Sequence, residues 1–244
     1  MKPLTKTEQA IMESRSIFQK TVKDADRSIM GKTETLLKRS TNVKLGKKVT
    51  KGHLRGFPIY TLTLEERATC PRSCAHWADC YGNNMHLAIR YNAGPALEAM
   101  LEDELVELQR KHPKGFLVRL HILGDFYSVS YVAKWAKWLT QFPALHIYGY
   151  TANQPNAADP TERAIGQAIK TLRDNCADNR FAIRFSGNFE DPEFTANSAD
   201  DTRAIAAVDA KQAFICPVQQ DRVKDCGSCA LCWTSRKPVV FITH

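Results

Sequence analysis

Three consecutive segments of the 244-residue chain decide its fold: FLVRLHILGD at residues 116–125, YVAKWAKWL at 131–139 and LHIYGYT at 145–151. The first and third segments are short and apolar, which is typical of buried strands. The middle segment has its apolar residues at helical spacing. Parallel strands need a crossover connection, usually a helix, so this arrangement predicts a parallel βαβ unit.

The same alternation continues on both sides of this unit. A strand is predicted at 56–64, a helix from Pro95, a second helix at 162–173, and further strands at 180–187 and 238–243. We therefore predict an α/β fold, a partial parallel (β/α) barrel. The acidic, weakly patterned stretch at 188–215 is expected to be a loop-rich connection.

Polar side chains recur on one face of three predicted strands, because residues two apart in a strand share a face. We expect these residues to line a polar interior that binds a polar ligand; they are Arg119, His121, Asp125, Tyr148, Tyr150 and Arg184. Gly124 and Asp125 also end a strand, where the active sites of parallel sheets lie. The alternative is that each is a satisfied core residue, although a buried arginine without an anionic partner is costly.

The eight cysteines fall mainly into two groups. Cys70, Cys74 and Cys80 form the first group, and Cys216, Cys226, Cys229 and Cys232 form the second; Cys176 stands alone. No apolar run approaches the roughly 20 residues of a membrane span, and residues 1–13 lack the apolar core of a signal peptide. We therefore expect a cytoplasmic protein with no membrane partner, in which clustered thiols are metal ligands rather than disulfides.

The ligand count favours iron–sulfur chemistry. Three thiolates on a [4Fe-4S] cluster leave one iron open, whereas a structural zinc site needs four ligands. The second group supplies four thiolates, so zinc is nearly as good an interpretation there. We expect one or two [4Fe-4S] clusters, with zinc as the alternative at the C-terminal cysteines.

The positive charge is concentrated at the N-terminus. The chain carries a net charge of +8, and residues 1–51 hold 13 Lys and Arg against 5 Asp and Glu. The densest part holds Lys44, Lys47, Lys48 and Lys51, which suggests phosphate contacts with nucleic acid. A solvated linker is an equally good interpretation. Apolar residues at helical spacing, from Ile11 to Ile29, predict one or two amphipathic helices in this extension.

A cysteine-rich loop after the first strand of a parallel barrel resembles the radical S-adenosylmethionine superfamily. The resemblance aligns Cys70, Cys74 and Cys80 with the cluster of that superfamily, and Gly124–Asp125 with the turn that holds the cofactor's amino group. It implies S-adenosylmethionine as a further cofactor. The cysteine spacing departs from the usual three and two intervening residues, because here it is three and five.

A closer resemblance, over most of residues 52–236, is to the phage and plasmid "gene product eighty-eight" domain family. It rests on Thr69-Cys70-Pro71, Cys80-Tyr81, Arg119-Leu120-His121 with Gly124-Asp125-Phe126, Tyr150-Thr151, and Cys229 to Trp233. It implies an origin in a mobile genetic element.

The predicted organisation is a basic helical extension at 1–55, a barrel-like core at 56–215 and a cysteine cluster with a closing strand at 216–244. Three functions remain open, and the third of them is an interaction module stabilised by zinc. The first is an iron–sulfur protein with a radical-enzyme-like fold that acts on or binds nucleic acid. The second is a non-catalytic DNA-binding or regulatory protein with structural or redox-sensing metal centres.

Overall fold

The computed structural model describes residues 3–29, 35–187 and 195–242. In this part of the chain, one sheet of eight strands has the order β2-β3-β5-β6-β7-β8-β10-β9, and β1 pairs with β4 separately. The strands are β1 (Val22–Lys23), β2 (Lys38–Arg39), β3 (Ile59–Thr61), β4 (Arg90–Tyr91), β5 (Phe116–Leu120), β6 (Leu145–Thr151), β7 (Phe181–Ser186), β8 (Thr195–Ser198), β9 (Phe214–Ile215) and β10 (Val239–Phe241). The helices are α1 (Lys6–Glu13), α2 (Glu66–Thr69), α3 (Pro95–Lys111), α4 (Val129–Gln141), α5 (Pro160–Asn175), α6 (Thr202–Asp209), α7 (Cys226–Cys229) and α8 (Leu231–Thr234).

Neighbouring strands in the main sheet run parallel, except that β2 is antiparallel to β3. The predicted mixed α/β fold with a mostly parallel sheet is therefore confirmed. The sheet is open, because β2 and β9 end it on opposite sides and do not pair with each other. The prediction of a partial barrel is therefore corrected to an open sheet.

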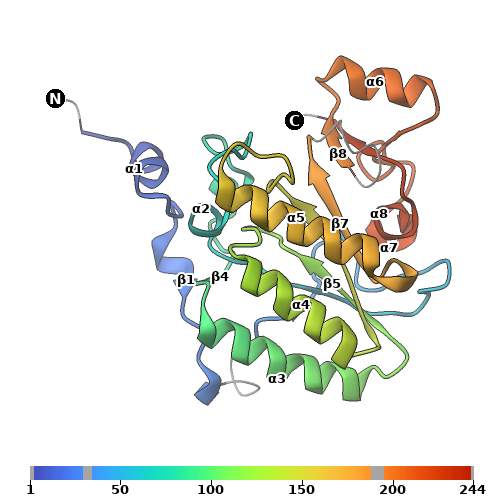
Figure 1. Cartoon of the computed structure of the whole chain (residues 1–244), viewed down its shortest axis with the longest axis horizontal. Coiled ribbons are helices and arrows are strands. Elements are labelled where there is room, and N and C mark those ends of the chain that lie inside the picture. The colour runs from blue at the N-terminus through green and yellow to red at the C-terminus, as the bar shows by residue number, and fades with distance from the viewer. Residues whose placement is uncertain (1–2, 30–34, 188–194, 243–244) are drawn as a thin grey trace.

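Helices α3, α4 and α5 form one layer on the sheet (Figure 1). Right-handed crossovers between strands in consecutive order place their helices on the same face. Each helix begins where the sequence allows it: Pro95 opens α3, the Ser128 hydroxyl accepts a hydrogen bond from the Tyr131 amide at 3.1 Å, and Asp159 caps α5. The layer packs on the sheet through the largest apolar cluster of the protein, which includes Trp135 and Ile169.

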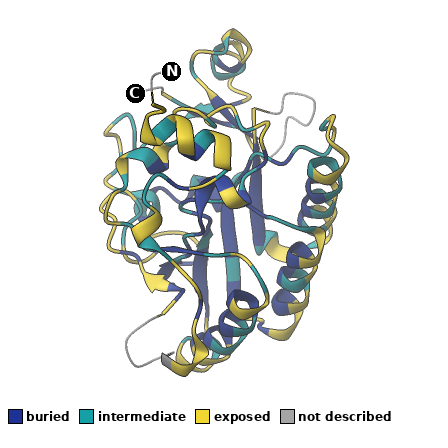
Figure 2. Ribbon diagram, turned by 90° about the vertical axis from the view of Figure 1, so that its left-hand side faces the viewer, coloured by how far each residue is buried: buried dark blue, intermediate teal, exposed yellow. Residues whose placement is uncertain are grey.

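The opposite face of the sheet is covered by irregular segments. Figure 2 shows the buried strands lying between the helical layer and these segments. The irregular segments are the C-terminal stretch with α7 and α8, and the loop at residues 47–57. Their shared cluster comprises Val49, Leu54, Ile59, Leu117, Tyr148, Ala182, Ala230, Cys232 and Trp233. The predicted open interior of a barrel is therefore filled by the protein's own C-terminal stretch.

Arg184 fastens this stretch to the sheet. Its side chain on β7 is fully buried. Its guanidinium donates to the carbonyl oxygens of Cys232 at 3.1 Å and Lys237 at 2.9 Å, and also to those of Thr195, Leu231 and Ser235. The carbonyls thus supply the partner that a buried arginine needs.

Two sequence predictions outside the sheet core need correction. The described part of 188–215 contains β8, α6 and β9, so this stretch extends the sheet and is not a loop-rich connection; residues 188–194 lie outside the described residues. In the basic extension, α1 ends at Glu13 and is followed by short 3-10 turns and the two-residue strand β1, so the residues from Ile11 to Ile29 do not form one helical stripe. The other predicted strands and helices are found, and the domain boundaries at 55 and 215 stay a prediction. No helix in the described ranges is long and apolar enough to span a bilayer.

Replacing Arg184 with methionine should destabilise the protein by about 3 kcal/mol, because several buried carbonyls lose their donor at once. Urea unfolding followed by circular dichroism measures this. The matched control is Arg203→Met, since Arg203 is exposed and pairs with Asp201 on the surface. Equal stability of the two variants would contradict the role given to Arg184.

Candidate functional site

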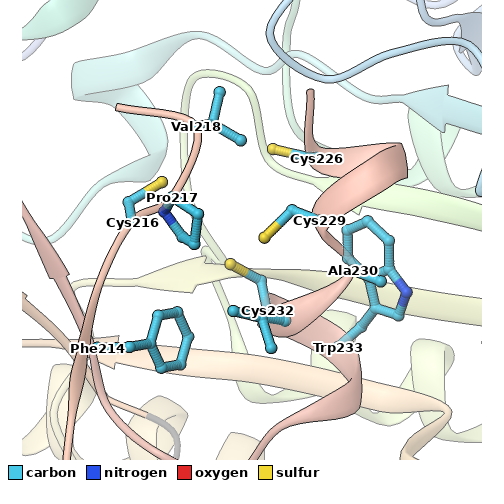
Figure 3. Close-up of a pocket in the computed structure, with 10 residues that line it drawn as sticks. Phe214, Cys216, Pro217, Val218, Cys226, Cys229, Ala230, Cys232 and Trp233 are labelled. Carbon is cyan, nitrogen blue, oxygen red and sulfur yellow. The ribbon is translucent and has the colours of Figure 1, made fainter. Parts of the chain in front are cut away.

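The four cysteines of the second group line one small pocket. Cys216 reaches it from the end of β9, and Cys226, Cys229 and Cys232 reach it from α7 and α8, with their sulfur atoms turned toward the shared space (Figure 3). Phe214, Pro217 and Trp233 are among the other residues that line the pocket. We refer to these four cysteines as the four-cysteine site.

Burial has the largest effect on the pKa values of three thiols in this site. It raises the pKa of Cys216 and Cys229, and it raises the pKa of Cys226 to about 12. The nearby charges of Lys44, Lys51 and Arg119 act in the opposite direction on Cys216, Cys229 and Cys226 respectively. In the absence of metal, burial therefore favours the protonated form of Cys216, Cys226 and Cys229, whereas the surrounding cations favour the thiolate form that a metal requires.

The predicted polar face of the sheet lies against this site. Arg119 pairs with Tyr148 across β5 and β6, and Tyr150 pairs with Arg184 across β6 and β7. The Arg119 guanidinium carbon is 4.5 Å from the ring centroid of Tyr150, whose hydroxyl donates to the sulfur of Cys232 at 3.2 Å. Trp233 packs on Tyr148 with the ring centroids 4.6 Å apart. The structure thus brings Arg119, Tyr148, Tyr150 and Arg184 together beneath the C-terminal stretch.

The lysine stretch, residues 44–51, lies directly beside the four-cysteine site. The amide of Cys226 donates to the carbonyl of Lys44 at 2.8 Å, and the amide of Gly227 donates to that of Leu45 at 3.0 Å. The amide of Thr50 donates back to the carbonyl of Gly227 at 2.9 Å. The side chains of Lys44, Lys47, Lys48 and Lys51 are exposed. The lysine stretch is therefore joined to α7 by backbone hydrogen bonds, and its four lysine side chains lie on the surface of the protein.

The three-cysteine loop, residues 70–80, begins where α2 ends. Cys70 caps this helix, its amide donating to the Glu66 carbonyl at 2.9 Å, and the Cys80 sulfur accepts the amide of Gly82 at 3.4 Å. Burial raises the pKa of Cys70, Cys74 and Cys80, and the charge of Asp125 raises it further at Cys70 and Cys74. The three thiols are close enough to influence one another.

Gly124 and Asp125 meet this loop, as their place at the end of a strand predicts. Gly124 has a positive φ of 82°, and a Cβ there would lie 2.6 Å from the hydroxyl oxygen of Thr69, so only glycine fits. The Asp125 carboxylate accepts the amides of Phe126 and Ala152, each at 2.7 Å, and the hydroxyl of Thr151 at 2.8 Å. Burial raises the pKa of Asp125 to about 6, against the effect of these hydrogen bonds.

His121 does not share the face of Arg119, contrary to the prediction. Strand β5 ends at Leu120, so the two-residue alternation stops before His121. Its imidazole lies on the helical side, where Nε2 is 3.3 Å from the Tyr131 hydroxyl and the ring packs on Phe126. Burial lowers the pKa of His121 to about 3. His121 is a core residue that does not line the site.

A buried charged network under the three-cysteine loop was not predicted. Arg90 and Glu66 form an ion pair at 2.7 Å, and both side chains are buried. Arg90 also donates to the carbonyls of Gly82 and Ala88, and Arg67 donates to the carbonyl of Trp77 at 3.0 Å. The only signal in the sequence is the run of charges, Glu65-Glu66-Arg67, between a strand and the first cysteine.

The described residues contain no group of three or more His, Cys, Asp or Glu side chains arranged to hold a metal ion. Metal binding at either cysteine group would therefore require the thiol side chains to move closer together.

Fold and site together define an open, mostly parallel α/β protein with two separate groups of thiols. The profile of the family described as Gene product 88 matches residues 35–235, so this chain belongs to the Gene product 88 family. The predicted resemblance to that family is confirmed.

Two curated relatives are phage proteins. The Gene 88 protein of Mycobacterium phage L5 is 31% identical over 143 residues, which is 55% of this chain and 57% of the relative. The Gene 88 protein of Mycobacterium phage D29 is 29% identical over 156 residues, which is 60% of this chain and 62% of the relative. The chain thus spans less than two thirds of either relative. Both sources agree with the predicted origin in a mobile genetic element.

No solved structure matches the chain significantly. The radical-enzyme-like barrel predicted from the cysteine loop has no support from these comparisons, and the sheet is open.

The buried His121 should make the protein sensitive to acid. An unfolded histidine has a pKa near 6.5, whereas the pKa of His121 is about 3, so unfolding takes up a proton between these values. The contribution of the neutral His121 to the free energy of unfolding is fully present above pH 6.5 and is lost as the pH falls toward 3. At pH 4.5 the loss should be on the order of 2 kcal/mol.

Urea unfolding at pH 7 and pH 4.5 tests this. His121→Gln should lose less stability than the wild type over this range, and His86→Gln, at an exposed position, should behave like the wild type. Asp125 titrates in the same range with the opposite sign but is present in all three proteins. Identical pH profiles for wild type and His121→Gln would show that the assignment is wrong.

Proposed function

We propose that this protein is a metal–thiolate protein that binds nucleic acid through the lysine stretch, with its metal centres serving a structural or redox-sensing role. The observation that carries the proposal is that the four-cysteine site and the lysine stretch form one hydrogen-bonded unit on the sheet. Metal ligands and phosphate-binding charges thus occur on adjoining segments.

The donor set supports the metal part of the proposal. Four thiols from two segments line one pocket, and the charges of Lys44, Lys51 and Arg119 are close enough to stabilise thiolates. Cys216, Cys226, Cys229 and Cys232 would hold a [4Fe-4S] cluster or, as the alternative, a zinc ion. A cluster would supply one-electron chemistry, whereas zinc would only cross-link the two segments.

Cys70, Cys74 and Cys80 are proposed as the ligands of a second cluster. Their loop is held by the buried Arg90–Glu66 pair and by Arg67. Burial and the charge of Glu66 raise the pKa of Cys80, whereas the charges of Arg67 and Arg90 act to lower it. Such support from surrounding groups is typical of metal sites, because it holds the backbone that carries the ligands.

A binding role is favoured over catalysis with S-adenosylmethionine. The inner face of the sheet, which would have to receive cofactor and substrate, is packed against Ala230, Cys232 and Trp233. Tyr148 and Arg184 on this face are buried, and Arg184 is committed to backbone carbonyls. Arg184, one of the residues predicted to bind a polar ligand, instead donates to the protein's own backbone.

The charge distribution supports nucleic acid as the partner. The net charge of +8 arises within residues 1–51, and the four lysines of the stretch are all exposed. Exposed lysines make phosphate contacts whose strength falls with salt concentration.

Purification without oxygen should give a brown protein with iron and sulfide. Cys229→Ser should lose the metal of the four-cysteine site, because serine is a poor ligand for soft metals. Cys176→Ser is the matched control, since this lone cysteine belongs to neither group, and it should retain full metal content. Metal and sulfide analysis with absorption spectra provides the measurement. Zinc without sulfide would select the alternative, and metal-free protein would refute the metal part of the proposal.

The double variant Lys47→Ala, Lys48→Ala should bind a random-sequence DNA duplex more weakly than the wild type. The slope of log affinity against log salt should fall by about 2, because each lost phosphate contact removes about 0.9. The control is Lys111→Ala, Lys114→Ala, which removes the same charge at the end of α3. Fluorescence anisotropy across a salt series measures both slopes. An equal loss in the two double variants would mean that net charge alone, and not this surface, binds DNA.

A further inference from the structure

We infer that metal occupancy of the four-cysteine site controls the affinity of the lysine stretch for nucleic acid. The inference rests on the proposed function and adds to it a form of regulation. It starts from the backbone contacts between α7 and the lysine stretch, which join this helix, the carrier of two of the proposed ligands, to both ends of the basic segment.

The ends of the lysine stretch are held by α7. At one end, the carbonyls of Lys44 and Leu45 accept the amides of Cys226 and Gly227, and at the other end the amide of Thr50 donates to Gly227. The middle is held differently, because the amide of Val49 donates to Phe57 and the amide of Ile59 donates to the carbonyl of Lys47. Loss of α7 would therefore free the two ends while the middle stays attached to the strand side.

The two segments fit backbone to backbone. A Cβ on Gly227 would lie 2.2 Å from the carbonyl oxygen of Lys48, and a Cβ on Gly46 would lie 2.8 Å from the Asp225 side chain. There is no flexible side chain at the first of these contacts to absorb a shift. Displacement of α7 must therefore move the lysine stretch as well.

The shape of α7 depends on its ligands. It has four residues, and a helix this short is not stable alone. Asp225 caps it by accepting the amide of Ser228 at 2.7 Å, but two of its four residues are the proposed ligands Cys226 and Cys229. The carbonyls that Arg184 holds begin at Leu231, beyond α7. A metal bound to these thiols would therefore be the main covalent constraint on this turn.

Charge acts in the opposite direction but more weakly. A four-thiolate centre adds negative charge near Lys44 and Lys51 and so disfavours phosphate. Its effect on phosphate falls as the salt concentration rises, because the lysines and the phosphates that they would contact are exposed. Loss of the shape of α7 changes the position of both ends of the stretch at once. We therefore expect the metal-loaded protein to be the tighter binder.

The full-length protein, loaded with metal or stripped by a chelator under thiol reductant, is titrated against a random-sequence DNA duplex. The loaded form should bind about tenfold more tightly, within the usual range of coupling between two sites. Hydrogen exchange on the wild type provides a second measurement. The amides of Cys226, Gly227 and Thr50 should lose protection when the metal is removed, and the amides of β6 should keep theirs.

The Gly227→Ala variant tests the contact between α7 and the lysine stretch without removing a proposed metal ligand. It adds a methyl group against the carbonyl of Lys48 and removes none of the four thiols. We expect this variant to retain its metal and to bind DNA as weakly as the stripped protein. Cys176→Ser is the control and should behave as the wild type in both states.

The outcomes distinguish the inference from the proposed function. A protein that binds neither metal nor DNA overturns both. A protein that binds both, but with equal DNA affinity and equal amide protection in loaded and stripped states, overturns the coupling alone. Metal-dependent affinity in the wild type that is lost in Gly227→Ala supports it.

Discussion

The strand order of the main sheet constrains everything else in this protein. Strands β3, β5, β6 and β7 follow one another in space as they do in sequence, so their right-handed crossovers put α3, α4 and α5 on one face. The other face is apolar at Ile59, Leu117 and Ala182 and has no helical layer of its own. Burying this face is worth about 25 cal/mol for each Å² of apolar area, and among the described residues the C-terminal stretch and the loop at 47–57 cover it.

That requirement explains why cysteines and polar residues meet there. The covering stretch is mostly irregular, so its backbone carbonyls need donors, and the fully buried Arg184 supplies several of them. Tyr150 serves the same need for the sulfur of Cys232. Polar residues on a strand therefore have two opposite explanations: they can face a bound ligand, or they can face irregular chain that lacks partners. In this protein Arg184 has the second role.

The sequence predicts the sheet well because strands and helices of this kind leave strong periodic signals. It identifies Arg119, Tyr148 and Tyr150 as sharing a face, and it places Gly124–Asp125 beside the cysteine loop, since strand alternation and parallel topology are local rules. It fails at His121, where the strand has already ended, and at β8 and β9, whose few apolar residues give no clear alternation. The Glu66–Arg90 pair joins residues 24 positions apart, and no local rule predicts such a pair.

The two cysteine groups differ in how the backbone around them is held. This difference bears on the metal-binding roles proposed for them. The three-cysteine loop is built on the buried Glu66–Arg90 pair and on Arg67, so its backbone is fixed by interactions that need no metal. Breaking a buried ion pair by removing one partner costs about 3 to 5 kcal/mol, so this support is strong. The turn of α7 is held by the Asp225–Ser228 capping box, by the Ala230 cap and by the backbone of the lysine stretch, and no buried ion pair supports it among the described residues. A metal would thus find the first group already ordered, whereas at α7 it would contribute to the order itself, and any response of the fold to metal should begin at that turn.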